Sequence, residues 1–304
     1  MAESLAHRWG QIIGDVFERF IRELLAEVAD RQGCYLDYKK PRKARARKGG
    51  AKDLSKVTWR DAFGNRHDLD YVLERGGTEE ALGIPVAFIE SAWRRYTKHS
   101  KNKVQEIEAA VMPVALTFSR YKPFCGAALA GEFTKSSLNQ LQTAGFGVLY
   151  IPYASILGAF AELGINASSE DGTAGTTEDD FRHKIEAWAA LEQPFALEKL
   201  IAKWRQHHSA EIATFVAKLE ESLTRHVTRV RLTVLRGHVV EVSDVKNAIS
   251  YLVEEENSMR IREDGEERER FEVQIRFNNG TVIDIATASR LDAITFLREH
   301  DVLG

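Results

Sequence analysis

The distribution of apolar side chains predicts a long amphipathic helix at the start of the chain. Over residues 3–30, apolar residues recur at every third or fourth position and form one face. Gly33 follows, and a glycine after such a pattern is typical of a helix C-terminus. Further on, the apolar runs 126–130 and 148–151 flank a helical pattern over 135–144. Strands that alternate with helices favour an α/β fold with parallel strand pairs.

Two short runs earlier in the chain predict strands that carry acidic residues. The first includes Asp68 and Asp70, and the second, an apolar run from Val86, ends in Glu90. Alternate residues of a strand share one face, so the two aspartates are expected on one side of their strand, with Glu90 and Ala92 together on theirs. We therefore expect carboxylates to converge where these strands end. A helix over 100–111 and a strand over 114–118 are predicted to follow.

The C-terminal part contains an internal repeat. Residues 230–242 match 273–285, and 248–252 match 293–297. Each copy predicts a strand, a glycine turn, a second strand and a helix, so we expect a compact ββα-ββα domain.

A small, polar and acidic stretch over residues 164–180 is typical of a linker. The expected organisation is a core over 1–163, a linker and helical section over 164–226, and a small α+β domain over 227–304.

Composition changes this picture mainly through the distribution of charge. The chain has 304 residues, is 44% hydrophobic and carries a net charge of −3, which suits a globular protein with a sizeable core. Residues 39–48 are strongly basic, whereas 254–269 are acidic. Nucleic acid is expected to meet the first segment and to avoid the second.

Cysteine content and hydropathy indicate the cellular compartment. Cys34 and Cys125 are far apart and outside any metal-ligand spacing, which suits a reducing environment. The sequence has neither an apolar run of membrane-spanning length nor a signal-peptide pattern. We expect a soluble, cytoplasmic protein that does not bind membranes.

Carboxylates beside concentrated lysine and arginine suit a divalent cation that meets a phosphodiester. Mg²⁺ takes oxygen ligands, often one or two carboxylates with water and substrate phosphate. Such an ion activates water and screens the charge that develops on phosphorus. The residues therefore predict a Mg²⁺ site, with Mn²⁺ as a substitute, in which Asp70 and Glu90 are ligands and Asp68 assists.

These residues resemble the PD-(D/E)xK, or restriction-endonuclease-like, nuclease superfamily. Its motif places an Asp on one strand and Glu-x-Lys on the next, as in Asp70-Tyr-Val-Leu and Val86-Ala-Phe-Ile-Glu90-Ser-Ala-Trp. The resemblance covers residues 10–155. It implies a restriction-endonuclease-like mixed sheet flanked by helices, here joined to the smaller C-terminal domain.

The first helix also resembles the opening helix of many family members. The matching residues are Gly14-Asp-Val-Phe-Glu18, followed by Ile21 and Leu24-Leu25. A glutamate of that helix reaches the metal site in the family, which makes Glu18 a candidate third carboxylate. An exposed helix glutamate without a catalytic role is the alternative for this residue.

The chain departs from the family motif at Ala92, where the family has lysine. That lysine positions or deprotonates the attacking water and stabilises the transition state, and a methyl group cannot do so. Either a natural lysine has been replaced, leaving an inactive form, or the cation has migrated. The intact sequence context favours replacement. The candidates for migration are Arg94, Lys98, Lys101 and Lys103.

Basic and polar residues around the motif are the candidate DNA contacts. Phosphate contacts of this kind give affinity rather than sequence choice. The alternative for each is an ordinary solvated charge. The candidates are Lys39, Lys40, Arg42, Lys43, Arg45, Arg47 and Lys48 in the basic segment, and Arg94, Arg95, Lys98, Lys101, Lys103 and Gln105 after Glu90.

Together, the residues and the resemblance predict a Mg²⁺-dependent DNA endonuclease. A nuclease like the type II restriction endonucleases, from a restriction-modification or phage-defence system, is the expected kind. Its partner would be double-stranded DNA, and cutting both strands suggests a homodimer. The alternatives are an inactive nucleic-acid-binding protein of the same fold, a repair or junction-cutting nuclease, and a partner-binding protein organised by the C-terminal repeat.

Overall fold

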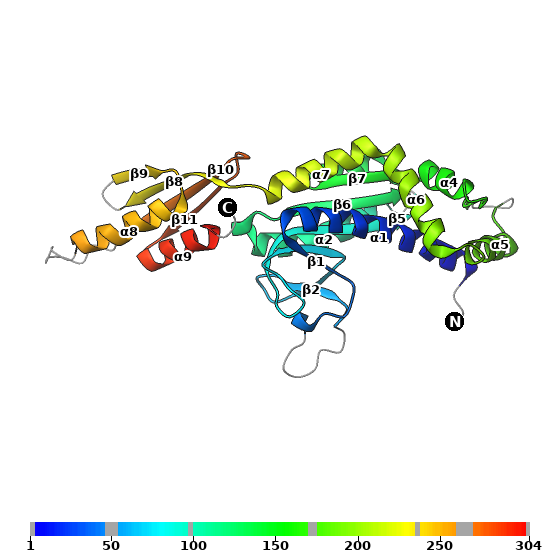
Figure 1. Ribbon diagram of the computed structural model, residues 1–304, viewed down its shortest axis with the longest axis horizontal. Coiled ribbons are helices and arrows are strands. Elements are labelled where there is room, and N and C mark those ends of the chain that lie inside the picture. The colour runs from blue at the N-terminus through cyan, green and yellow to red at the C-terminus, as the bar shows by residue number, and fades with distance from the viewer. Residues whose placement is uncertain are drawn as a thin grey trace. The chain divides into compact units, whose positions relative to one another are not determined.

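The protein folds as two compact units, Met1–Glu220 and Glu221–Gly304, in a computed structural model (Figure 1). The structure describes residues 4–45, 54–96, 100–169, 175–234, 238–259 and 270–301. Helices that follow the acidic stretch after residue 164 pack within the first unit rather than forming a part of their own.

A five-stranded mixed sheet forms the centre of the first unit, with the strand order β1-β4-β5-β6-β7. The strands β1, β4 and β5 pair antiparallel, whereas β5, β6 and β7 pair parallel. This confirms the predicted mixed α/β architecture. The strands are β1 (Cys34–Tyr38), β4 (Tyr71–Arg75), β5 (Ile84–Arg94), β6 (Phe124–Gly131) and β7 (Gly147–Pro152), beside a two-stranded ribbon of β2 (Val57–Arg60) and β3 (Arg66–Leu69).

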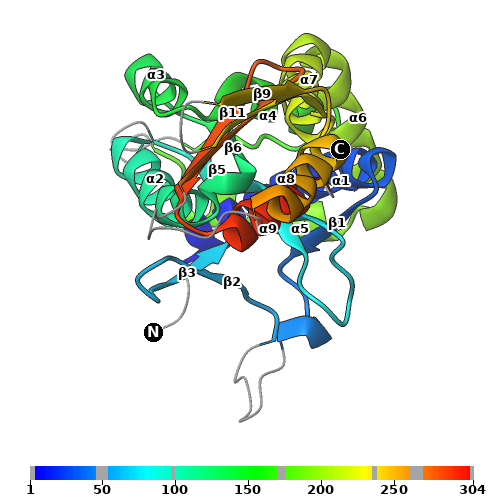
Figure 2. The ribbon, with the colours of Figure 1, turned by 90° about the vertical axis from the view of Figure 1, so that its left-hand side faces the viewer.

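Helices cover both faces of this sheet, as Figure 2 shows. The helices α2 and α3 lie on one face, where Val104, Ile107 and Leu141 pack against the sheet residue Phe88. The helices α1 and α4 lie on the other face. The helices of this unit are α1 (Leu5–Gln32), α2 (Ser100–Thr117), α3 (Lys135–Thr143), α4 (Tyr153–Ala161), α5 (Glu178–Ala189), α6 (Gln193–His207) and α7 (Ser209–Leu223).

The long first helix forms as its sequence predicts. The side chain of Ser4 accepts a hydrogen bond from the His7 N–H at the helix start, and Gly33 ends the helix with a φ of 61°. On the buried face, Phe17 and Phe20 make edge contacts with Trp204 of α6. This packing fixes α1 against the sheet and against the helical section, so the polar side chains of its other face have defined positions.

The predicted strand over residues 114–118 is wrong, because α2 continues to Thr117. Pro113 lies inside the helix, but Val111 and Val114 are fully buried on either side of it. Burial of this apolar stripe against the sheet outweighs the backbone hydrogen bond that the proline removes. The apolar run is compatible with either a strand or a helix, and its packing against the sheet stabilises the helix.

The second unit has the predicted ββα-ββα order. In its central pair of strands, Val230 lies opposite Ile275 and Leu232 opposite Val273, whereas in the repeat Val230 corresponds to Val273 and Leu232 to Ile275. The two copies are thus related by an approximate twofold axis. The sheet order is β11-β10-β8-β9. The elements are β8 (Val227–Val234), β9 (His238–Val242), α8 (Val245–Met259), β10 (Phe271–Phe277), β11 (Val282–Thr287) and α9 (Arg290–Asp301).

Among the helices that the structure describes, none has both the length and the apolar character needed to cross a membrane.

Candidate metal and nucleic-acid site

The pairing of β4 with β5 brings Asp70 and Glu90 together. Tyr71 lies opposite Ile89 in this pair, so the residue before β4 meets Glu90. The Asp70 N–H donates to Glu90 Oε1 at 3.0 Å, and the Ser91 N–H donates to Asp70 Oδ2 at 2.8 Å. The two carboxylates therefore converge, as the alternation of the strands predicted, and backbone hydrogen bonds fix both of them.

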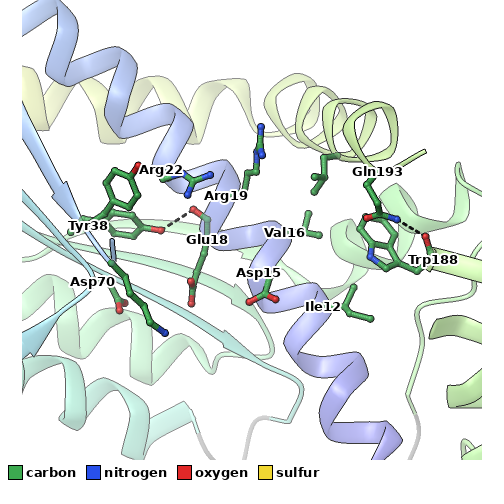
Figure 3. A pocket seen from close by; sticks show the side chains of 13 residues that line it. Ile12, Asp15, Val16, Glu18, Arg19, Arg22, Tyr38, Asp70, Trp188 and Gln193 are labelled. Carbon is green, nitrogen blue, oxygen red and sulfur yellow. Dashed lines mark hydrogen bonds between the residues drawn. The ribbon is translucent and has the colours of Figure 1, made fainter. Parts of the chain in front are cut away.

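Helix α1 adds Glu18 to this pair. The Tyr71 hydroxyl donates to the Glu18 carbonyl oxygen at 2.8 Å and so ties the helix to the start of β4. Partial burial and the charges of Asp70 and Asp15 raise the pKa of Glu18. In Figure 3, Asp15 and Glu18 project from the same side of α1, toward the region that Asp70 occupies. We call Glu18, Asp70 and Glu90 the acidic centre.

Glu90 is the buried member of the acidic centre. This side chain is buried, at 6% exposure. Burial and the charge of Asp70 raise its pKa to about 8, while the nearby charge of Lys103 opposes the rise. Burial, followed by the charges of Glu18 and Asp70, likewise raises the pKa of Tyr71. Burial and the neighbouring charges thus disfavour the ionised carboxylates of the centre, and a bound cation would offset that cost.

The raised pKa of Glu90 predicts that the metal-free protein loses stability as the pH rises. In the unfolded chain Glu90 would titrate near the ordinary value of 4.5, whereas its folded pKa is about 8. Between these values the folded state binds more protons than the unfolded state, so the free energy of unfolding falls with increasing pH. Urea denaturation in EDTA across this range should show the decline, and Glu90→Gln should flatten it. Equal slopes in both proteins would contradict the assignment.

Asp68, which was predicted to assist the metal site, bonds with residues outside the acidic centre. The strand that was expected to carry both aspartates is interrupted: Asp68 lies in β3 of the two-stranded ribbon, and Asp70 directly precedes β4 of the main sheet. The side chain of Asp68 is half exposed and bonds with Lys56 at 2.8 Å and Thr58 at 2.5 Å. The change of sheet between the two residues directs this carboxylate into a local ion pair.

The acidic centre offers oxygen donors alone, which is the chemistry that Mg²⁺ requires. Among the described residues, no group of three or more His, Cys, Asp or Glu side chains is arranged to hold a metal ion. Asp70 and Glu90 nevertheless meet at one point and repel each other as carboxylates. Mg²⁺ is commonly held by one or two carboxylates, with water and phosphate as its other ligands. The pair fits that mode of binding.

Ala92 lies on the α2 side of β5, with an exposed fraction of 6%. It lines a cavity of about 280 Å³ together with Glu18, Asp70, Arg94 and Lys103. The Lys103 side chain is 20% exposed and lies 3.5 Å from Glu106, and its charge also acts on Glu90. The methyl group at position 92 thus faces the same cavity as a lysine from α2. Of the candidates for a migrated cation, Arg94 and Lys103 line this cavity.

Arg42 and Arg45 were predicted to contact DNA, and the structure corrects both predictions. Arg42 is 1% exposed and binds Glu74 through two hydrogen bonds, at 2.6 and 3.1 Å. Asp37 is a partner of both arginines, at 2.9 Å from Arg42. The basic run therefore has a buried side that holds the segment to β1 and β4, because each arginine has acidic partners in the core. We call Asp37, Arg42, Arg45 and Glu74 the buried ion cluster.

The other candidate DNA contacts divide by exposure. Lys39, Lys43, Lys101 and Gln105 are exposed. Lys40 is half buried, 3.3 Å from Glu79, and Arg95 stacks on Tyr96 at 4.3 Å. Arg47, Lys48 and Lys98 lie outside the described residues. Among the described candidates, the exposed side chains are accessible to a phosphate, and Lys43 also lies 3.6 Å from Glu80.

Sequence reasoning missed Asp15, Arg22 and Tyr71. All three line a second cavity, of about 460 Å³, together with Glu18, Lys39 and Asp70. Asp15 precedes Glu18 by three residues, a spacing that places both on one side of a helix. That spacing was readable from the sequence. The contribution of Tyr71 depends on the approach of α1 to β4, which local patterns do not encode.

Comparison with protein-family models, with curated proteins and with solved structures finds no match to this chain. Its class therefore rests on its own geometry. It is a mixed α/β protein with an acidic centre where one helix meets the start of β4 and the inner part of β5, joined to a small unit built from two ββα copies.

Proposed function

We propose that this protein is a Mg²⁺-dependent DNA endonuclease related to the PD-(D/E)xK nucleases. The observation that supports this most directly is the convergence of Asp70 and Glu90, with Glu18 adjacent and lysines on two sides. Lys39 lines the larger cavity of the centre and Lys103 the smaller one. A role in restriction or phage defence, with the two centres of a homodimer cutting double-stranded DNA, is the biological setting that we propose.

Asp70 and Glu90 would hold the cation in this reaction. Bound Mg²⁺ neutralises phosphate charge and lowers the pKa of water, which makes water a nucleophile near neutral pH. Ser91 holds Asp70 in position through its N–H, and the Asp70 N–H in turn orients Glu90. The positive charges of Lys39 and Lys103 attract the substrate phosphate and stabilise charge that develops on it.

Lys103 is the residue that we propose in place of the motif lysine. Lys103→Met is expected to lower Mg²⁺-dependent cleavage by roughly a hundredfold, the scale of losing one positioned charge at a reacting group. Lys101→Met is the matched control, since Lys101 is exposed on the same helix and does not line the cavity. Single-turnover cleavage of a labelled oligonucleotide measures both. Equal losses would indicate general DNA attraction and would exclude a specific role for Lys103.

Metal binding and plasmid cleavage together test the function. Mg²⁺ or Mn²⁺ should raise the melting temperature of the native chain, because an ion that binds only the folded state stabilises it. Cleavage should require the metal and stop with EDTA. Ala92→Lys should cleave DNA at least as fast as the chain with alanine. A large increase in the cleavage rate would identify the chain with alanine as an inactive form. A protein that neither binds the metal nor cleaves with lysine at position 92 would rule out the nuclease.

A further inference from the structure

The larger cavity of the acidic centre continues along α1 to a second, chemically different end. Its volume is about 460 Å³. Glu18 and Asp70 line one end, and Trp188 and Leu197 from the helical section line the other. Figure 3 shows the acidic side chains on one side of this space and Trp188 with Gln193 on the other. One cavity thus joins a charged region to an apolar one.

The apolar end is built from both sides. Ile12 and Val16 are four residues apart on α1, so their side chains lie on the same face of the helix. Opposite them, Trp188 packs against Phe160 with the ring centroids 5.6 Å apart, which fixes the indole. The Gln193 amide donates to the Trp188 carbonyl oxygen at 2.6 Å. The wall is therefore held in place by contacts of its own.

Three basic side chains line the cavity around its acidic end, and Asp15 lies between the two ends on α1. Arg19 bonds with Glu23 at 2.8 Å, and Arg22 lies over the Tyr38 ring at 5.2 Å from its centroid. Lys39 is exposed, and its charge opposes the rise in the pKa of Glu18. A strand of alternating negative and apolar groups suits this arrangement, with phosphate at the basic and metal-binding region and a flat apolar group at Trp188.

The spacing along α1 is compatible with one nucleotide lying across the cavity. From Glu18 to Ile12 the helix rises by about 9 Å, at 1.5 Å per residue. A base next to the reacting phosphate can cover that distance only if it has left the stack, because a duplex keeps both faces of each base covered. An apolar wall then contacts the base without reading its sequence. Trp188 and Val16 are 8% and 3% exposed, so the less buried Ile12 and Leu197 supply most of this contact.

We propose that this cavity binds an unpaired nucleobase next to the scissile phosphate, so that the substrate is DNA with a single-stranded or flipped nucleotide at the cut. This inference rests on the proposed function for the position of the phosphate. It adds the substrate class: the cleaved strand is unpaired where it passes α1. Ile12, Val16, Trp188 and Leu197 form the base subsite.

Binding of the full chain to fluorescent oligodeoxythymidine tests the subsite, with EDTA present to prevent metal-dependent cleavage. The probes are the intact oligomer, a set with one abasic position each, and a duplex of equal length. Removal of one particular base is expected to weaken binding roughly tenfold, the scale of a lost aromatic stack. The duplex, which is the proposed substrate, should bind more weakly than the intact single strand because one of its bases must first be flipped out of the stack. Equal binding of all abasic oligomers would overturn the proposal.

Variants then locate the effect. Ile12→Ala combined with Leu197→Ala should remove the difference between intact and abasic oligomers, since both residues are only half buried and their truncation leaves the core intact. Phe195→Ala is the matched control, because Phe195 is 61% exposed on α6 and does not line the cavity. If the control removes the difference equally, the subsite lies elsewhere and the proposal fails.

The two proposals fail separately. Base-dependent binding without any Mg²⁺-dependent cleavage, even with lysine at position 92, would remove the nuclease and leave the subsite. Cleavage with no base dependence would leave the nuclease and remove the subsite.

Discussion

Replacing Asp70 with asparagine is expected to abolish Mg²⁺-dependent cleavage while making the metal-free protein more stable. Cleavage should fall by at least about a thousandfold, because the amide removes one of the two charges that hold the cation. The free energy of unfolding should rise in EDTA, since burial and then the charge of Asp70 raise the pKa values of Glu90 and Glu18, and the variant removes the second of these causes. Cleavage assays and urea denaturation measure the two effects on one preparation.

The opposite signs are what make this variant informative. If a residue only maintained the fold, replacing it would lower activity and stability together. If a site holds like charges close together for function, removing one of those charges lowers activity but raises stability. Asp68→Asn is the matched control, since Asp68 lies two residues away and bonds with Lys56 outside the acidic centre. It should retain cleavage within a fewfold. A destabilised Asp70→Asn, or an equally inactive Asp68→Asn, would contradict the assignment.

Replacing Arg42 with methionine is expected to cost about 3–5 kcal/mol of stability, the scale of breaking a buried ion pair on one side. The side chains of Asp37 and Glu74 are 1% and 0% exposed, so the loss of Arg42 leaves two carboxylates in the core with one cation fewer. Arg42 also donates to the carbonyl oxygens of Thr78 and Ala81, so the turn between β4 and β5 should loosen as well. Urea denaturation gives the free energy of unfolding.

Lys43→Met is the control for Arg42→Met. The Lys43 side chain is 78% exposed and lies 3.6 Å from Glu80, so its removal should change stability by no more than about 0.5 kcal/mol. The same pair separates the two roles in the basic segment. Lys43→Met should weaken DNA binding and reduce its salt dependence, because the exposed Lys43 side chain can reach a phosphate. A stable Arg42→Met protein with weakened DNA binding would reverse our correction for Arg42.

The sequence predicted all three residues of the acidic centre, but it also placed Asp68 beside them. Alternation along β5 and the position of Asp70 before β4 were sufficient to predict that the two carboxylates lie close together, because the geometry of paired strands is regular. Asp68 was misplaced because the chain changes sheets between Leu69 and Tyr71, and a change of one residue in a strand boundary redirects a side chain completely.

Charge patterning was less reliable than apolar patterning. A run of lysine and arginine is usually a solvated surface segment. Here Arg42 and Arg45 are directed inward because they form ion pairs with Glu74 on β4 and Asp37 on β1. Those partners are 5 to 32 residues away in sequence, and no local rule connects them. The strand predicted for the apolar run at the end of α2 was wrong for a related reason, since packing against the sheet stabilises the helix there.

The approximate symmetry of the C-terminal unit has a consequence for assembly. A single ββα copy would expose β8 as an edge and could complete its sheet by pairing with a second molecule. In this chain β10 occupies that edge, so the two copies satisfy each other internally. Only β9 and β11 stay at the borders of the sheet. The facing edges of β8 and β10 are therefore already paired within the chain, and a second molecule could add strands only at β9 or β11.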